Sequence, residues 1–316
     1  MNDIFTVGVI GARGHTGAEL VRLISGHPHL ELGFAGSREL AGQPVPGVDS
    51  IVFGSINADD LTSRDVDVVI LALPDGAGDP FVAAVDEDTV IVDISADHRF
   101  DDSWAYGLPE LQRKVLRNTT RIANPGCYAT AMQIALAPLV DAISGVPAVF
   151  GVSGYSGAGV TPGPRNDSER LRDNLIPYQL VGHNHEREAI RHLGIAVRFM
   201  PHVHPAFRGL IVTAHIPLRT AMTAEEVRTR FEDDYGEEPL IEIRSEIPEM
   251  KDGTGHPGVI IGGFETSADG FNAVVVAAED NLLKGAAVQA IQNVNLALGL
   301  HEFAGLVAEV PIDRVP

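Results

Sequence analysis

VGVIGARGHTG, residues 7–17, is the stretch that decides the fold of this chain. Its first four residues form a short, fully apolar run of the kind found in buried parallel strands. A glycine-rich turn with the spacing G-x-x-G-x-x-G follows, and the amphipathic residues 18–24 predict a helix. Strand, turn and helix together predict a dinucleotide-binding α/β unit, because glycines let backbone N–H groups and the helix N-terminus approach a pyrophosphate. A tight glycine turn without a nucleotide is the alternative.

The end of the second predicted strand, residues 30–36, indicates which cofactor is bound. About 20 residues after the glycine turn, a site for NAD usually carries an acidic residue. Ser37 and Arg38 stand there, and an arginine beside a hydroxyl suits the 2′-phosphate of NADP. The sequence therefore favours NADP as cofactor, while Glu39 keeps NAD open and a solvated surface charge is the plainer role for Arg38.

Two further strands are predicted over residues 66–73 and 90–94, and each ends in a polar loop. Ligands of open parallel sheets lie beyond the carboxyl ends of the strands, so we expect these loops to face the nicotinamide half of the cofactor. Arg99 follows the second loop and suits a carboxylate or phosphate, with a structural ion pair as the alternative. The candidate cofactor contacts in this half of the chain are Gly11, Arg13, Gly14, His15, Thr16, Gly17, Ser37, Arg38, Leu73 and Pro74.

Composition and charge narrow the class of protein. A chain of 316 residues exceeds one ordinary core, which predicts two domains. No apolar run approaches the roughly 20 residues that span a bilayer, so we expect no membrane partner. The net charge of −20 disfavours nucleic acid and requires a local basic site for any anionic substrate. The N-terminus lacks the pattern of a secretion signal and one cysteine suits a reducing cytosol, so we expect a cytoplasmic protein.

Cys127 is the only cysteine, so it cannot form an intramolecular disulfide. It follows the turn Asn124-Pro125-Gly126, and the helix-like residues 129–136 come directly after it. At a helix N-terminus, unpaired backbone N–H groups and the helix dipole stabilise a thiolate over a thiol. This position favours a reactive nucleophile, and a small buried side chain is the alternative.

The chain beyond Cys127 has a different pattern and predicts a second domain. Its polar stretch, residues 154–174, is long enough to be a functional or a disordered loop. A long apolar helix is predicted over residues 282–300, and we expect it to pack on the first domain. The remaining predicted elements are strands over 148–153, 198–204, 209–217, 259–264 and 271–277 in a mixed sheet, with helices near 185–193 and 223–234 on one side.

Two pairs of histidines, His183 with His185 and His202 with His204, are the candidate proton carriers. His185 opens a predicted helix, and Glu188 three residues later can orient its imidazole. Zinc sites usually draw three or four ligands, so we predict no metal. Capping of a helix, or a polar interior position, is the alternative role for either pair.

Eight motifs between residues 6 and 300 occur in one order along the chain. They are residues 11–17, 93–100 (DISADHRF), 106–110 (YGLPE), 124–128 (NPGCY), 153–159 (SGYSGAG), 183–188 (HNHERE), 201–209 (PHVHPAFRG) and 280–287 (DNLLKGAA). In this order they resemble the N-acetyl-gamma-glutamyl-phosphate reductase family of arginine biosynthesis, which is related to aspartate-semialdehyde and glyceraldehyde-3-phosphate dehydrogenases. The resemblance implies an α/β fold, with an NADP-binding Rossmann domain (1–127 and 281–316) and a central α/β domain with a mixed sheet (128–280) for catalysis and dimerisation. It also implies a homodimer or homotetramer.

The resemblance further implies that Cys127 attacks a small acyl phosphate substrate and that NADPH reduces the resulting thioester to the semialdehyde. His185 is then the first choice for the proton carrier and His183 the second, and the backbone at Gly126 and Cys127 would hold the oxyanion. Candidate substrate contacts are Arg99, Asn124, Glu188 and Arg208, and Ser156, Gly157, Ala158, Asn281 and Lys284 would line the nicotinamide side.

The chain departs from the family pattern at Asp75, at His204 and in a short stretch over residues 49–63. The first two leave the cofactor and substrate preferences open. One alternative is the lysine-pathway homologue that reduces an aminoadipyl phosphate on a carrier protein, since one methylene is worth only about 1–3 kcal/mol. A second alternative is aspartate-semialdehyde dehydrogenase, but NPGCY is not the motif that surrounds the thiol in that family. A nucleotide-sensing module without chemistry is disfavoured because Cys127, the histidines and Arg99 occur together.

Overall fold

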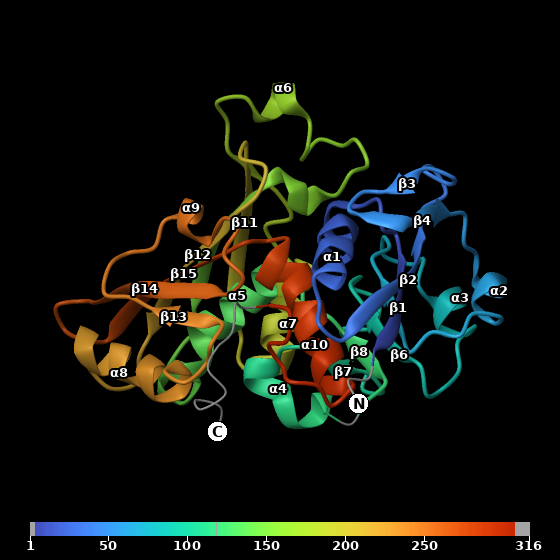
Figure 1. Ribbon diagram of the computed structural model, residues 1–316. Helices are drawn as coiled ribbons and strands as arrows, with labels where there is room; N and C mark the ends of the chain where they lie inside the picture. Colours follow the sequence, from blue (N-terminus) through green and yellow to red (C-terminus); the bar gives the residue numbers. More distant parts are fainter. Residues whose placement is uncertain (1–3, 118, 307–316) are drawn as a thin grey trace. The chain divides into compact units, whose positions relative to one another are not determined.

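The protein is seen in a computed structural model that describes residues 4–117 and 119–306 (Figure 1). Its internal contacts divide the chain into two compact units, which change over at Gly126/Cys127 and at Gly285/Ala286. The first unit is Met1–Gly126 with Ala286–Pro316, and the second unit is Cys127–Gly285. No helix within the described ranges has the length and apolar character that crossing a membrane requires.

The first unit is built on a sheet whose described strands run in the order β3-β4-β2-β1-β5-β6-β8-β7. All neighbours are parallel except β3 and β4, and the central order is that of a Rossmann fold. The strands are β1 (Phe5–Ile10), β2 (Leu30–Gly36), β3 (Pro44–Val45), β4 (Val48–Gly54), β5 (Val68–Leu71), β6 (Val90–Asp93), β7 (Ala105–Tyr106) and β8 (Arg121–Ala123). The predicted strand over 30–36 is confirmed in full, and those over 66–73 and 90–94 are shorter than predicted.

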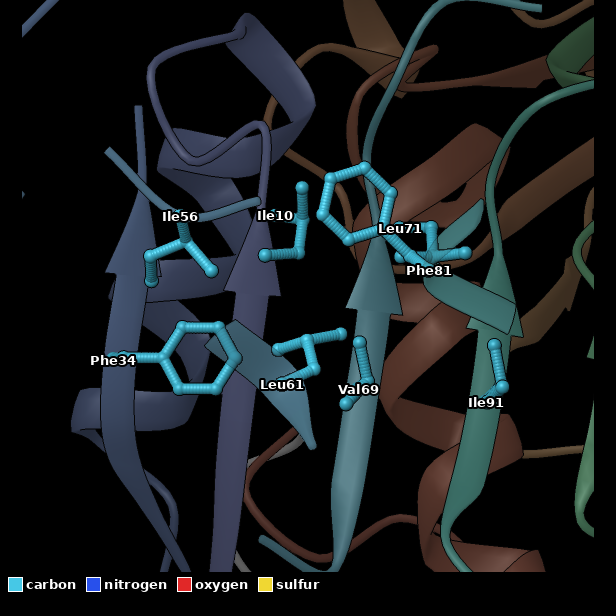
Figure 2. Close-up of a cluster of buried hydrophobic side chains, with 8 residues drawn as sticks. All are labelled: Ile10, Phe34, Ile56, Leu61, Val69, Leu71, Phe81 and Ile91. Atoms are coloured by element: carbon cyan, nitrogen blue, oxygen red, sulfur yellow. The ribbon is translucent and has the colours of Figure 1, made fainter. Parts of the chain in front are cut away.

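Helices cover both faces of this sheet. Figure 2 shows one face, where side chains of β1, β2, β5 and β6 pack under Leu61 and Phe81. On the other face α1 packs against β1 and β2, and α10 packs against β6, α1 and α4. The helices of this unit are α1 (His15–Ser25), α2 (Ala58–Leu61), α3 (Asp79–Val82), α4 (Pro109–Leu116) and α10 (Val288–Ala297).

The C-terminal helix packs within the first unit as predicted, but its extent and character differ from the prediction. Instead of one helix over 282–300, a π-helical turn (Leu283–Ala287) leads into α10. α10 is buried on all sides and carries four fully buried amides, Gln289, Gln292, Asn293 and Asn295. These amides form hydrogen bonds inside the first unit: Asn293 Nδ2, for example, donates to Gly107 O at 2.9 Å. The sequence predicted an apolar helix, whereas the buried surface of α10 includes these four polar side chains.

The second unit contains the predicted mixed sheet, in the order β10-β11-β9-β12-β15-β14-β13. β9 and β11 are parallel, as are β13 and β14, and the other neighbours are antiparallel. The strands are β9 (Ala148–Gly154), β10 (Ile176–Pro177), β11 (Arg198–His204), β12 (Leu210–Pro217), β13 (Ile241–Ile243), β14 (Val259–Thr266) and β15 (Asn272–Glu279).

Helix α5 (Cys127–Leu136) is the centre of this unit, because it packs against β12, β15 and α7 (Asn184–Leu193). α8 (Ala224–Tyr235) packs against β13 and β14. The predicted loop over 154–174 has internal structure, since Asn166 Nδ2 donates to Gly159 O and Thr161 O. It also contains the 3₁₀ turn Tyr155–Ala158 and helix α6 (Ser168–Leu171), and α9 (Met250–Gly253) completes the unit.

Candidate active site

The glycine turn of the first unit is packed so closely that two of its glycines cannot be replaced. Gly11 has a φ of +85°, and a Cβ atom there would lie 2.1 Å from the carbonyl oxygen of Ala72. A Cβ atom on Gly17 would lie 2.4 Å from Gly11 O, whereas at Gly14 the nearest atom is 3.4 Å away. α1 begins without a side-chain cap and without an acidic residue in its first turn. Its N–H groups and positive end are therefore suited to an anion such as a pyrophosphate.

The residues after β2 are held against this turn. Gly11 N–H and Ala12 N–H both donate to Gly36 O at 3.0 Å. Ser37 is buried, and its hydroxyl accepts a bond from Leu40 N–H at 3.3 Å. Arg38, one residue further, is exposed. The structure therefore brings Ser37 and Arg38 close to the glycine turn, as the prediction of a cofactor site requires.

The loops after β5 and β6 are bonded to each other. Asp97 accepts a bond from Gly76 N–H, and Asp75 accepts one from Ala96 N–H at 3.0 Å. Asp75, one of the departures from the family pattern, thus has a local role in joining the two loops. Leu73 and Pro74 open the first of these loops, next to β1 in the sheet.

Arg99 and Asn124 are buried and bonded to the backbone inside the first unit. Arg99 Nε donates to Asn124 O at 2.8 Å, and its Nη2 donates to Ile94 O at 2.6 Å. Asn124 Nδ2 donates to Ala286 O at 3.3 Å, and its Oδ1 accepts from Asn293 at 3.1 Å. The sequence predicted substrate contacts for both residues. The bonds seen here fix the chain three residues before Cys127, and the substrate contacts stay a prediction.

Cys127 is the first residue of α5, and its side chain is half-buried. The first turn of α5 contains no acidic residue, and each later residue of this helix is buried. Gly285 packs against Cys127: a Cβ atom there would be 2.6 Å from Cβ of Cys127 and 2.8 Å from Oε1 of Glu279. Glu279 is fully buried. The sequence reasoning missed Glu279 and Gly285 because the chain returns to Cys127 only about 150 residues later.

The pKa values of two tyrosines, the buried Tyr128 and the partly buried Tyr178, are raised by burial and also by the charge of Cys127. Burial raises the pKa of Tyr178, and the negative charge of the Cys127 thiolate raises it further. Burial likewise raises the pKa of Tyr128 well above its ordinary value, with smaller contributions from Tyr178 and Cys127. Tyr128 donates its hydroxyl proton to His202 O at 2.7 Å. Both phenols therefore stay protonated throughout the neutral range.

The two histidines of the HNH motif have different positions. His183 is the N-cap of α7, and its Nδ1 accepts a bond from His185 N–H at 3.1 Å. In the neutral ring the proton of His183 is then on Nε2. His185 lies in the first turn of α7, with its ring 4.7 Å from that of His183 and 6.0 Å from that of Tyr128. Glu188 is fully buried one turn further along the same helix.

The predicted nicotinamide-side residues and Arg208 are joined by a separate set of bonds. Arg208 Nε lies 3.2 Å from Oδ2 of the buried Asp280. Asn281 Nδ2 donates to Ser156 Oγ at 2.9 Å, and its Oδ1 accepts from Gly209 N–H at the same distance. Gly157 and Ala158 follow in the same 3₁₀ turn as Ser156, and Lys284 is fully buried. His204, the other departure from the family pattern, is exposed and accepts a bond from Ala206 N–H.

Comparisons with known proteins identify the family of this chain. The model for the NAD-binding domain of semialdehyde dehydrogenases matches residues 6–119, and the model for their dimerisation domain matches residues 127–281. N-acetyl-gamma-glutamyl-phosphate reductase of Stenotrophomonas maltophilia is 51% identical over 97% of this chain and 99% of its own. The Xanthomonas campestris reductase is 52% identical over 95% and 98%. This chain belongs to the N-acetyl-gamma-glutamyl-phosphate reductase family.

Solved structures show how far the fold of this reductase family extends. Aspartate semialdehyde dehydrogenase II of Vibrio cholerae has a TM-score of 0.76 at 21% identity, covering 93% of this chain and 98% of its own. Aspartate semialdehyde dehydrogenase with NADP from Candida albicans has a TM-score of 0.73 at 17% identity, with the same coverage. The resemblance stated from the sequence is thus confirmed for family and fold.

In this member of the reductase family, the predicted site residues are divided between the two units. The first unit holds the glycine turn with Ser37 and Arg38, and the second unit gathers Cys127 and the histidines where α5 packs on α7. Within the described ranges no three His, Cys, Asp or Glu side chains gather as a metal-binding group. Besides Glu279 and Gly285, the sequence reasoning missed Tyr128, Tyr178 and Asp280, whose neighbours cannot be seen from residue type.

Proposed function

We propose that this chain reduces N-acetyl-L-glutamyl 5-phosphate with NADPH, giving N-acetyl-L-glutamate 5-semialdehyde and phosphate in L-arginine biosynthesis. The observation that carries the proposal is the single thiol at the N-terminus of α5, with His185 on the neighbouring helix α7. The identity of 51% to a reductase of that name, over nearly the whole of both chains, supports the choice of substrate.

The thiol supplies the covalent step. The Cys127 sulfur attacks the acyl carbonyl carbon, the carbon–oxygen bond to phosphate breaks, and a thioester remains on the enzyme. The N-terminal N–H groups of α5 stabilise the thiolate and are suited to hold the oxyanion of each tetrahedral species. NADPH, when bound, supplies the hydride that reduces the thioester. The hemithioacetal on Cys127 then collapses to the semialdehyde and regenerates the thiolate.

His185 is our choice for the group that moves protons at the substrate oxygen. His183 already uses Nδ1 to cap α7, which leaves it a fixed orientation and only Nε2 for other work. Glu188 lies one turn along the helix from His185, where a carboxylate orients an imidazole. Arg208 remains a candidate substrate contact, since its guanidinium is half-buried beside Asp280 and carries a permanent charge.

We also propose NADP(H) as the cofactor, held by the residues of the first unit. The open N-terminus of α1 fits a pyrophosphate, and Ser37 with the exposed Arg38 fits a ribose 2′-phosphate. We propose that Arg99 and Asn124 position the chain before Cys127, since both are buried and bond backbone and amide groups of the first unit.

The chain carries a dimerisation domain, and we propose a homodimer or homotetramer formed through the sheet of the second unit. On β9, Phe150 is 40% exposed and its ring lies 4.4 Å from that of His202 on β11. Thr213 and His215 of β12 are also exposed, and they alternate with the buried residues Val212, Ala214 and Ile216 of the same strand. Light scattering after gel filtration should give two or four chains per particle, and a monomer would contradict the proposal.

The reverse reaction tests the function. N-acetylglutamate semialdehyde, phosphate and NADP are mixed with the enzyme, and the formation of NADPH is followed by its absorbance. We expect turnover that requires phosphate and that is faster with NADP than with NAD. Inactivity on this aldehyde, together with turnover of the aminoadipate analogue, would move the chain to the lysine pathway. Nucleotide binding without turnover of either aldehyde would favour the nucleotide-sensing module.

A further inference from the structure

The site for the adenosine half of the cofactor contains an acidic residue as well as basic ones. Glu39 lies three residues beyond the end of β2, near the position where an acid binds the ribose hydroxyls of NAD in Rossmann folds. Its Oε2 lies 2.5 Å from Nη1 of Arg13, which belongs to the glycine turn. Glu39 thus carries the charge that an NAD site uses, and Arg13 compensates that charge.

Backbone hydrogen bonds hold the two residues of this ion pair close together. Gly11 N–H and Ala12 N–H, which directly precede Arg13, both donate to Gly36 O, three residues before Glu39. Ser37 N–H donates to Gly54 O at 2.8 Å, which fixes the segment from its other side. The two side chains therefore extend from backbone segments bonded to one carbonyl oxygen.

Stability does not explain the pair. The side chains of Arg13 and Glu39 are 35% and 67% exposed, and ion pairs this open to solvent contribute little to folding. The charges act instead on whatever binds beside the turn. A ribose 2′-phosphate is repelled by a free carboxylate, whereas a 2′-hydroxyl donates a bond to it.

We propose that Arg13 sets the preference for NADP(H) over NAD(H) by neutralising Glu39, so that Arg38 meets a 2′-phosphate without an opposing charge. This inference rests on the proposed cofactor site. Arg13 acts through Glu39 and need not touch the phosphate itself. The first unit thus contains a cofactor site for NADP in which an acidic residue typical of NAD sites is neutralised.

Nucleotide fragments test the proposal without any need for catalysis. Calorimetric titration with 2′,5′-ADP and with 5′-ADP measures the contribution of the 2′-phosphate in the full-length enzyme and its variants. Arg13→Gln should weaken 2′,5′-ADP roughly five- to tenfold and leave 5′-ADP bound as well or better, as expected for one exposed carboxylate made free. Glu39→Gln should tighten 2′,5′-ADP by a few-fold.

The double variant Arg13→Gln/Glu39→Gln distinguishes compensation from contact. With no acid to neutralise, it should regain the wild-type preference between the two fragments to within about twofold. A double variant as weak as Arg13→Gln alone would show that Arg13 binds the phosphate directly, and would overturn the inference. Arg22→Gln is the matched control, since it breaks the exposed Arg22–Glu19 ion pair within α1, and it should change neither affinity.

The affinities of the wild-type enzyme for the two fragments distinguish the role of Arg13 from the proposed choice of NADP. Equal binding of the two fragments by the wild-type enzyme would overturn the NADP assignment and the role of Arg13 with it. A clear wild-type preference for 2′,5′-ADP, combined with an unchanged preference in Arg13→Gln, would overturn only the role of Arg13.

Discussion

Helices α1 and α5 begin differently from helix α8. At α8 the hydroxyl of Thr223 accepts a bond from Glu226 N–H, and the Glu226 carboxylate accepts one from Thr223 N–H, which closes a capping box. α1 and α5 have no acidic residue in the first turn. α8 thus satisfies its positive end with its own side chains, whereas α1 and α5 carry no carboxylate of their own in the first turn.

α1 and α5 differ in the anion that the helix start is suited to stabilise. α1 follows a glycine turn that a pyrophosphate can approach, and its N-cap, Gly14, has no side chain that could occupy the helix start. α5 starts with the thiol of Cys127, so its anion is part of the chain. The packing matches: α1 is buried on one side only, but α5 is buried at every residue after Cys127. A ligand site needs an open side, and a nucleophile needs a rigid support.

Of the changes that test this comparison, replacing the thiol should have the largest effect on activity. Cys127→Ser keeps the shape of the helix start but removes the anion, because a serine hydroxyl does not ionise at neutral pH. We expect kcat of the reverse reaction to fall by about four orders of magnitude or more. The midpoint of thermal unfolding should change little, which checks that the fold is kept. Activity near that of the wild type would remove Cys127 from the chemistry.

Replacing each histidine should sharpen the division of work on α7. His185→Asn should lower kcat by about two to three orders of magnitude, the usual loss when a positioned proton carrier is removed. His183→Asn should cost much less, because asparagine is also a good N-cap for α7. Comparison of kcat for the two variants across pH 6–9 measures the difference. A larger loss in His183→Asn would reverse the assignment.

Filling the space beside the thiol should test the rigid support of α5. In Gly285→Ala the new methyl group would meet Cβ of Cys127 at 2.6 Å and the Glu279 carboxylate at 2.8 Å. We expect kcat to fall roughly tenfold or more and the free energy of unfolding to fall by about 1–3 kcal/mol. Gly26→Ala is the control, since its nearest atoms are 3.9 Å away. Equal effects of both substitutions would contradict the close packing at Cys127.

Removing the cap of α8 should have the smallest effect and only on stability. Thr223→Ala should lower the free energy of unfolding by about 1 kcal/mol and leave kcat unchanged. Bonds from the Thr223 backbone and hydroxyl lower the pKa of Glu226 from its ordinary 4.5. The stabilisation by this carboxylate is present above that pH and is lost as the pH falls through the lowered pKa. Denaturant titrations at pH 7 and pH 4 should show a smaller difference between wild type and variant at pH 4.

Elements that form one local pattern could be predicted from the sequence. β2 and β11 have the predicted bounds, because an apolar or alternating run between turn residues leaves few other choices. The glycine turn was predictable for the same reason, since strand, turn and helix are adjacent in the chain. These are the parts whose structure is decided within about 20 residues.

Features made by distant residues could not be predicted in this way. The burial of Glu279 beside Gly285 and Cys127 depends on the return of the chain to α5, and no periodicity shows it. Arg99 and Asn124 were predicted as substrate contacts from their residue types. The backbone and amide groups of the first unit that they bond could be found only in the tertiary structure.

The acyl group on Cys127 is the claim on which the account depends, and it can be measured before any reduction occurs. Freshly prepared N-acetylglutamyl phosphate is mixed with the enzyme in the absence of NADPH, with Cys127→Ser as the control. We expect a burst of one phosphate per active chain, and mass spectrometry should find the acyl group on the peptide that contains Cys127. Absence of the burst, or an equal burst from Cys127→Ser, would contradict a thioester on this thiol.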